Sequence, residues 1–124
     1  MQVPGPPGRP WAEAVEVTAL TLRWEPPAHV GGSEVRSYRL LAQTGGMDGF
    51  KVLLDDTGGS APEVRVTRLE PTTWYEFEVA AINYNGLGPP GPPSEPILTL
   101  GGGGGGGAGV RRRRTTQGAS ALRA

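Results

Sequence analysis

Hydrophobic and polar residues alternate one by one over much of the chain between residues 10 and 100. Leu20, Leu22 and Trp24, for example, stand at every second position with polar residues between them. This period of two is typical of a strand with one buried face, and no stretch keeps the spacing that an amphipathic helix requires. The pattern predicts strands near Val15 and over residues 20–24, 37–42, 50–54, 64–66, 74–81 and 97–100.

Turn-forming residues separate these runs. Proline or glycine pairs stand at 26–27 and 45–46, and the stretch DDTGGSAP fills residues 55–62. Each of these residue types favours a turn, through a fixed φ, a freely positive φ or a side chain that bonds the nearby backbone. Short strands with turns about every 8 to 12 residues favour an all-β, antiparallel sandwich of seven strands.

Both ends of the chain differ in composition from the middle. The start, MQVPGPPGRP, is rich in proline, which fixes φ and removes hydrogen-bond donors, so residues 1–8 are predicted to be an extended linker. Residues 101–124 offer almost nothing to bury, and we expect a disordered, low-complexity tail rich in glycine and arginine. The folded domain is predicted to span residues 9–100.

The formal net charge is zero, but the charges are unevenly distributed. Residues 1–100 hold all 12 acidic residues and 7 of the 12 basic ones, which gives 7 − 12 = −5, and the other five bases lie in the tail. Arg111–Arg114 would attract an anionic lipid or a nuclear importer, so targeting through the basic tail is one alternative function. The tail lacks interleaved aromatic residues, and we expect no nucleic-acid partner.

Few residues offer catalytic or metal-binding chemistry. The chain has no cysteine, and its single histidine, His29, lies in a loop flanked by proline and glycine. A histidine that serves as a general base must lie beside a nucleophile, and no G-x-S-x-G motif is present. Asp48, Asp55 and Asp56 are interpreted as turn residues because no spaced set of cation ligands accompanies them. We therefore expect no enzymatic activity, no cofactor and no metal.

The stretch NGLGPPGPPSEP, residues 85–96, contains the G-x-G-x-x-G spacing of a dinucleotide-binding loop. Such a loop presents backbone N–H groups to phosphate at the start of a helix. Pro89 and Pro90 stand at the two variable positions and remove two donors, and no helix is predicted to follow. Collagen needs many Gly-X-Y repeats, and two are too few. We interpret the stretch as a loop before the last strand.

The order and spacing of the large residues resemble the fibronectin type III domain. The matching residues are Trp24-Glu25-Pro26-Pro27, Tyr38, Leu69-x-Pro71-x-Thr73-x-Tyr75-x-Phe77-x-Val79-x-Ala81-x-Asn83-x-x-Gly86-x-Gly88 and Pro92-Pro93-Ser94-x-Pro96. The resemblance implies a seven-stranded antiparallel β-sandwich of immunoglobulin-like fold. One departure is an extra Gly-Pro-Pro before the last strand, which lengthens that loop.

The resemblance also implies roles for individual residues. Trp24 and Tyr38 would be large apolar centres on opposing sheets. The hydroxyl of Tyr75 would bond back to the backbone near residues 69–71, in the arrangement called the tyrosine corner. The implied core consists of Leu20, Leu22, Trp24, Tyr38, Leu40, Val66, Leu69, Tyr75, Phe77, Val79 and Ala81.

A finer likeness concerns EPPAHVGGSEVRSY, residues 25–38, which resembles a loop common in fibronectin type III modules of giant muscle proteins of the titin kind. It implies a non-catalytic interaction or spacer module of a larger cytoskeletal, muscle or signalling protein. Its partners would be other proteins and neighbouring domains of the same chain.

Cell-surface receptors carry similar loops, so an extracellular adhesion module is the alternative. No secretory signal and no run of about 18 apolar residues is seen, so we expect no membrane span. For the chain as given, a cytoplasmic or cytoskeletal location is favoured, and an extracellular one applies if a signal lies upstream.

Several residues are candidates for protein contacts. In this register Trp74 faces away from the core, and an exposed tryptophan is a favoured interface anchor. Glu76 and Glu78 share its face, where Arg39 or Arg36 is predicted to pair with them. Loops on a rigid scaffold also carry binding residues. The predicted interaction surface comprises Arg39, Trp74, Glu76, Glu78, Asn85 and Leu87.

The segment VPGPPGR, Val3–Arg9, fits a proline-rich ligand pattern that ends in a basic residue. A polyproline II helix would present its prolines to an aromatic groove and Arg9 to an acidic pocket. A proline-recognising domain is therefore a candidate partner, and a plain linker is the alternative.

Overall fold

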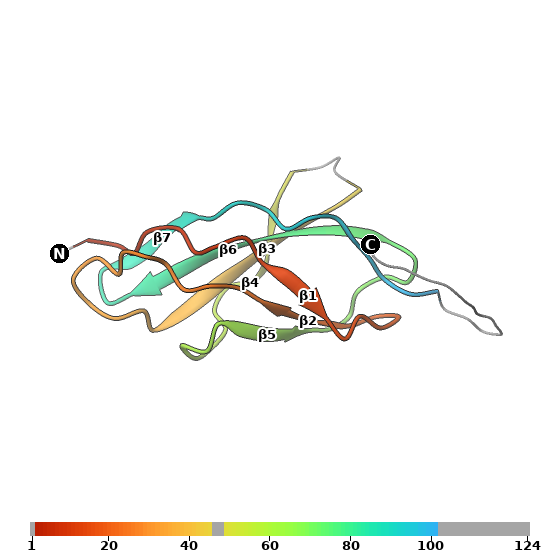
Figure 1. The fold of residues 1–124 in the computed structure, drawn as a ribbon, viewed down its shortest axis with the longest axis horizontal. Coiled ribbons are helices and arrows are strands. Elements are labelled where there is room, and N and C mark those ends of the chain that lie inside the picture. The colour runs from red at the N-terminus through yellow and green to blue at the C-terminus, as the bar shows by residue number, and fades with distance from the viewer. Residues whose placement is uncertain (1, 46–48, 102–124) are drawn as a thin grey trace.

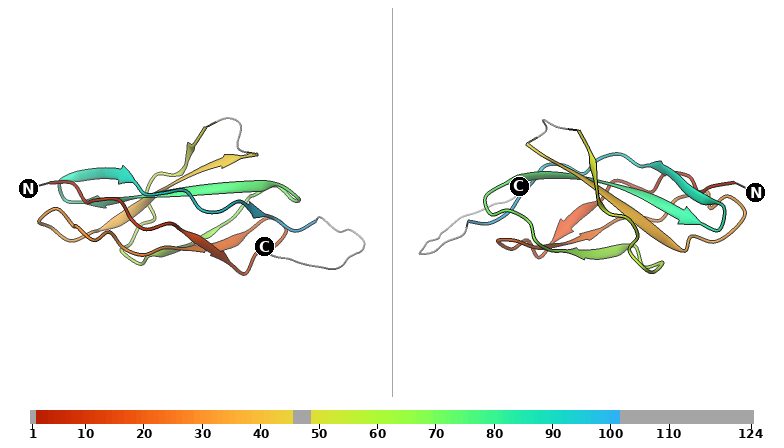
Figure 2. Two further views of the ribbon diagram at one scale, coloured as in Figure 1. Left: turned by 45° about the horizontal axis from the view of Figure 1, so that its top comes forward. Right: turned by 180° about the vertical axis from the view of Figure 1, so that it is seen from behind.

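The computed structural model describes residues 2–45 and 49–101 and consists of two antiparallel sheets that face each other (Figure 1). The described residues contain no helix, which confirms the predicted all-β fold. Of the predicted tail, residues 102–124 lie outside the described part of the chain. The two further views show the sheets as separate layers along the length of the molecule (Figure 2).

The smaller sheet, sheet A, contains three strands in the order β1-β2-β5. The strands are β1 (Trp11–Glu13), β2 (Leu20–Arg23) and β5 (Glu63–Val66). In the register, Leu20 lies opposite Val66 and Leu22 opposite Val64, so the apolar positions of both strands share the inner face. This arrangement follows directly from the alternation in the sequence.

The larger sheet, sheet B, has the order β4-β3-β6-β7, and β8 pairs with β6 as well. Its members are β3 (Ser37–Thr44), β4 (Lys51–Leu54), β6 (Trp74–Asn83), β7 (Gly86–Pro90) and β8 (Ile97–Leu98). The central pair, β3 and β6, is continuous from Ser37 opposite Ile82 to Thr44 opposite Tyr75. These two long strands form the centre of sheet B, and their outward side chains make up much of its outer face.

The core lies between the two sheets, and the structure buries every residue of the implied core in one cluster. Trp24, directly after β2, meets Tyr38 of β3 across the gap, with ring centroids 5.0 Å apart and planes inclined at 73°. This edge-to-face geometry is favoured for aromatic pairs. The pair therefore joins the two sheets near the middle of the sandwich.

The tyrosine corner is present at the start of β6. The backbone N–H of Glu70 donates a hydrogen bond of 2.7 Å to the hydroxyl oxygen of Tyr75. Between them, Thr72 has a φ of 50°, in the left-handed region that β-branched residues rarely adopt. The bond thus ties a tight turn to the strand that follows it.

The prediction of a loop over residues 85–96 is wrong in part, because residues 86–90 form strand β7. β7 and β8 pair with opposite ends of β6 and form one interrupted edge strand, so the sandwich has seven strands in this sense. Between the halves, the N–H groups of Gly91 and Ser94 still donate to the carbonyl oxygens of Val79 and Phe77. Prolines are tolerated here because they lie on an edge strand.

The first strand also differs from the prediction, since it covers Trp11–Glu13 and not Val15. Ala14 follows it with a φ of 50°, which ends the extended backbone before Val15 is reached. Val15 still packs against the core as a partly buried residue. An inward apolar side chain in a bend therefore gave the same sequence signal as a strand.

Candidate interaction surfaces

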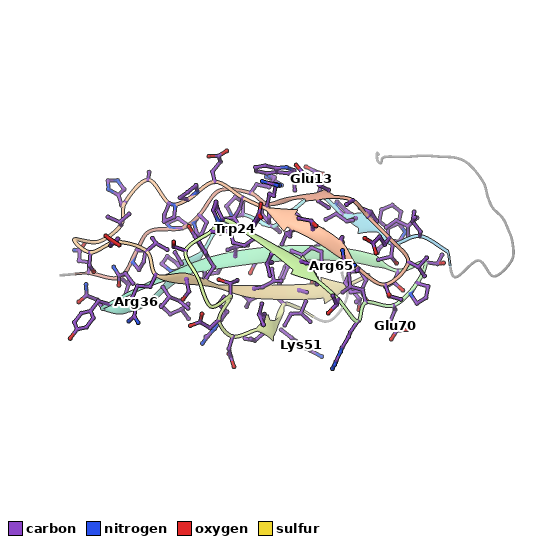
Figure 3. The ribbon with its side chains drawn as sticks, turned by 90° about the horizontal axis from the view of Figure 1, so that it is seen from below. Glu13, Trp24, Arg36, Lys51, Arg65 and Glu70 are labelled. Atoms are coloured by element: carbon purple, nitrogen blue, oxygen red, sulfur yellow. The ribbon has the colours of Figure 1, made fainter. Side chains whose placement is uncertain are left out.

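The outer face of sheet A is covered by ion pairs. Arg23 of β2 contacts Glu13 of β1 at 2.9 Å and Glu63 of β5 at 2.8 Å. Next to them, Arg65 forms two hydrogen bonds with Glu16, at 3.0 and 3.1 Å. Glu13 and Arg65 are labelled in Figure 3, where sheet A lies in front. Because these charges satisfy one another, this face offers few free groups to a partner.

The outer face of sheet B presents apolar side chains instead. Trp74 at the start of β6 is 52% exposed and lies opposite Leu98 of β8, which is 40% exposed. A hollow of about 390 Å³ beside the indole is lined by Trp74, Glu76, Gly45 and Pro96. Alternation places Trp74 outward because its neighbour Tyr75 points into the core. We call the set Trp74, Glu76, Pro96 and Leu98 the Trp74 patch.

The predicted pairing of Glu76 and Glu78 with Arg39 or Arg36 is wrong. Arg39 lies opposite Ala80, and its guanidinium contacts Asp55 at 3.5 Å. Glu76 lies opposite Gln43 and accepts a hydrogen bond from its side-chain amide. The register of β3 on β6 decides these partners, and it offers each glutamate a neutral neighbour.

Glu78 lies opposite Leu41, and Leu41 lies opposite the exposed Val52 on the other side. Burial raises the pKa of the Glu78 carboxyl above its ordinary value. The middle of the outer face of sheet B therefore combines the apolar side chains of Leu41 and Val52 with one partly desolvated carboxyl, and Arg39 lies beside them.

Asn85 and Leu87 do not join the Trp74 patch. Asn85 lies in the turn after β6 and Leu87 lies opposite Ile82 near that end of the strand, so both are roughly 25 to 30 Å from Trp74 at about 3.3 Å per strand residue. The Asn85 amide donates to the carbonyl oxygen of Gln2 at 3.0 Å, so it holds the N-terminal segment. The structure thus divides the predicted surface into a Trp74 end, a middle with Arg39 and Glu78, and an Asn85 end.

The N-terminal segment, residues 2–10, packs along the domain and does not stand apart as a separate linker (Figure 1). Its backbone N–H groups at Gly5 and Gly8 donate to the carbonyl oxygens of His29 and Glu25 at 2.8 and 3.0 Å. On its other side it lies against β7 and the residue that follows it, Gly91. Pro4, Pro7 and Pro10 are fully buried.

The described residues that were candidates for catalysis or metal binding have structural roles instead. His29 is exposed, and its carbonyl oxygen accepts the Gly5 hydrogen bond. A carboxylate oxygen of Asp56 accepts a hydrogen bond of 2.7 Å from the Gly58 N–H, as in a capped turn, and Asp48 lies outside the described residues. Within residues 2–45 and 49–101 there is no group of three or more side chains suited to a metal ion. The same residues contain no helix long and apolar enough to cross a membrane.

Sequence reasoning missed several members of these surfaces. Pro96 and Leu98 belong to the Trp74 patch only because β8 returns beside the start of β6. Tyr84, at the turn after β6, is 79% exposed and was not singled out. The alternation indicates which side chains point outward, but the sequence does not indicate which strands lie side by side.

The fold defines a class, the immunoglobulin-like β-sandwich of two antiparallel sheets. The family profile of the fibronectin type III domain matches residues 5–97, so the chain belongs to the fibronectin type III family. This confirms the resemblance drawn from the sequence. The match begins inside the segment that was predicted to be a linker.

The relatives are longer proteins, and this chain spans about a tenth of their length or less. The chain is 35% identical over 99 residues to contactin-5 of Gallus gallus, covering 77% of this chain and 10% of that protein. It is 32% identical over 84 residues to the human cell adhesion molecule-related/down-regulated by oncogenes protein, covering 68% of this chain and 6% of the relative. A crystal structure of titin domains has a TM-score of 0.73 and 29% identity, covering 80% of this chain and 33% of that one.

Proposed function

We propose that the domain, with predicted bounds 9–100, is a non-catalytic interaction or spacer module of a larger modular protein. The Trp74 patch is its main contact surface for a neighbouring domain or a protein partner. The observation that carries this proposal is the 52% exposure of Trp74 beside a hollow, at the end of a sheet face whose ion pair, Arg39 with Asp55, lies away from the Trp74 patch. Tryptophan is one of the residue types enriched among energetically important contacts.

The titin structure and the loop at residues 25–38 support a cytoskeletal, muscle or signalling context for this module. A second context is favoured by a specific observation, since the relatives with 35% and 32% identity are a contactin and a cell adhesion molecule-related protein. In either context the mechanism is the same, because the patch buries apolar area against a partner and Glu76 remains at its polar rim.

Proximity labelling in cells tests the proposal, with the labelling enzyme fused to the full chain. The variant Trp74→Ala is compared with Trp11→Ala. Trp11 is a matched control because it is 42% exposed but lies on the opposite sheet. We expect Trp74→Ala to lose specific neighbours that the unaltered chain and Trp11→Ala both retain.

The expected loss reflects about 2 kcal/mol or more of contact energy for a buried interfacial tryptophan, which is a factor of roughly 30 in affinity. Both variants must keep the thermal stability of the unaltered chain for the comparison to count. Identical neighbours for all three chains would show that the Trp74 patch is not the contact surface.

A further inference from the structure

The segment Val3–Arg9, which fits the proline-rich ligand pattern, is bound by the domain itself. Two of its prolines, Pro4 and Pro7, are fully buried, and Pro10 continues the same spacing of three. Val3, Pro6 and Arg9 between them are exposed. Burial of every third residue is the pattern of a polyproline II segment, which has three residues per turn, lying with one edge in a groove.

The groove is built from backbone that comes unusually close to the segment. A Cβ atom on Gly88 would collide with the carbonyl oxygen of Pro4, and one on Gly91 would collide with that of Pro7. Neither glycine has a positive φ, so close approach and not backbone conformation requires glycine here. On the other side, the N–H groups of Gly5 and Gly8 bond to residues 25–29.

Arg9 completes the arrangement. Its guanidinium donates to the carbonyl oxygen of Pro93 at 2.9 Å and lies 3.6 Å from the Glu95 carboxylate. The two prolines and the base are the same three groups that a proline-recognising domain reads, with prolines in a groove and the base beside an acidic group. The segment cannot offer these groups to the domain and to a partner at the same time.

We propose that Val3–Arg9 is a masked ligand for a proline-recognising domain of the SH3 type. It binds only when the segment leaves its groove beside β7, so the partner and the domain compete for Pro4, Pro7 and Arg9. The apparent affinity of the partner is then the affinity for the free segment multiplied by the fraction of chains in which the segment is released. Any event that frees the segment, such as tension on the N-terminal side, would raise that fraction.

The binding test uses an SH3 domain that prefers ligands with a C-terminal basic residue, titrated with a synthetic peptide of residues 1–10 and with the full chain. We expect the full chain to bind at least about tenfold more weakly than the peptide, because few chains have a released segment. The variant Gly88→Ala/Gly91→Ala removes the space for the segment and is expected to bind within about threefold of the peptide.

Gly59→Ala is the matched control, since a Cβ there meets nothing within 4 Å and its φ is not positive. It should bind as weakly as the unaltered chain. Adding Pro4→Ala and Pro7→Ala to the released variant should abolish binding. Equal affinity of the peptide and the unaltered chain, or no binding by the peptide, would overturn the proposal.

A second measurement uses only the unaltered chain and needs no substitution. Hydrogen exchange of the Gly5 and Gly8 amides in the unaltered chain is followed with and without a saturating SH3 domain. We expect the partner to remove the protection of these two amides while the amides of β3 and β6 keep theirs. Protection that persists in the bound state would mean that the partner does not displace the segment, and masking would be wrong.

Discussion

At the scale of single residues, side chains of the same type differ in burial and in the partners they contact. Tyr75 and Tyr84 lie nine positions apart, yet one is buried with a bonded hydroxyl and the other is 79% exposed. Glu76 and Glu78 lie two positions apart and share a face, but Glu76 lies opposite Gln43 and Glu78 opposite Leu41, and burial raises the pKa of the Glu78 carboxyl. These differences allow matched tests within one chain.

Tyr75→Phe is expected to destabilise the domain by about 1 kcal/mol, because it removes the hydrogen bond from the Glu70 N–H but keeps the buried ring. Chemical denaturation monitored by tryptophan fluorescence measures the free energy of unfolding. Tyr84→Phe removes an exposed hydroxyl and should change this free energy by less than about 0.5 kcal/mol. Equal effects of the two substitutions would contradict the tyrosine corner.

Glu78→Gln is expected to raise the melting temperature at pH 7 and to have no effect at pH 3. Burial raises the pKa of Glu78 in the folded state above the ordinary value of 4.5. With a raised folded pKa, stability is fully present below pH 4.5 and falls as the pH rises through the folded pKa. A neutral glutamine avoids that loss, and scanning calorimetry at both pH values measures it.

The gain for Glu78→Gln should stay below about 1 kcal/mol because the carboxyl remains partly exposed. Glu34→Gln, in the exposed loop before β3, is the control for removal of one negative charge. A gain that is the same at both pH values would show that packing of the amide, and not the carboxyl charge, is responsible.

At the scale of secondary-structure elements, the long strands follow from sequence and the edges do not. The alternation in β2, β3 and β6 is strong because one face of each strand is buried. β7 was missed because two prolines and two glycines suggested a loop, although an edge strand tolerates them. β1 was placed too late because Val15 packs inward from a bend.

Ser94 supports the interruption between β7 and β8. Its buried hydroxyl oxygen accepts a hydrogen bond of 2.9 Å from the Phe77 N–H, so a side chain replaces backbone where the ladder is broken. Ser94→Ala should therefore cost about 1–3 kcal/mol, because the Phe77 donor is left buried without a partner. Urea denaturation measures the loss. Ser60→Ala, at an exposed position, is the control, and a similar small effect for both would contradict this role.

At the scale of the whole molecule, the segments at both ends of the domain pack against the sandwich between them. The N-terminal segment fills the groove beside β7. After β8, the Leu100 N–H donates to the carbonyl oxygen of Glu16, and its own carbonyl oxygen accepts from the Thr72 N–H, at 3.0 Å each. Residues 2–10 and Leu100, the two ends of the described part of the chain, are thus joined to the sandwich by backbone hydrogen bonds.

Truncation after Gly101 is therefore expected to leave the melting temperature unchanged. Truncation after Pro96 should lower it strongly, because β8 and the buried Thr99 are lost. The Thr99 hydroxyl accepts from the Thr73 N–H at 2.9 Å and donates to the Glu70 carbonyl oxygen at 2.6 Å, so its removal leaves buried groups unpaired. Thermal denaturation followed by circular dichroism compares the two, and equal melting temperatures would contradict a structural role for β8.

The sequence by itself determined the fold class, the inward-facing residues and the outward position of Trp74. These follow from local alternation, because a strand with one buried face must repeat every two residues. Only the tertiary structure decided which strands are neighbours, and with them the partners of Arg39, Glu76 and Glu78. It also decided that Pro4 and Pro7 of Val3–Arg9 are buried. A free linker and a docked segment have the same composition, and here the docked form is possible because distant glycines leave a groove for it.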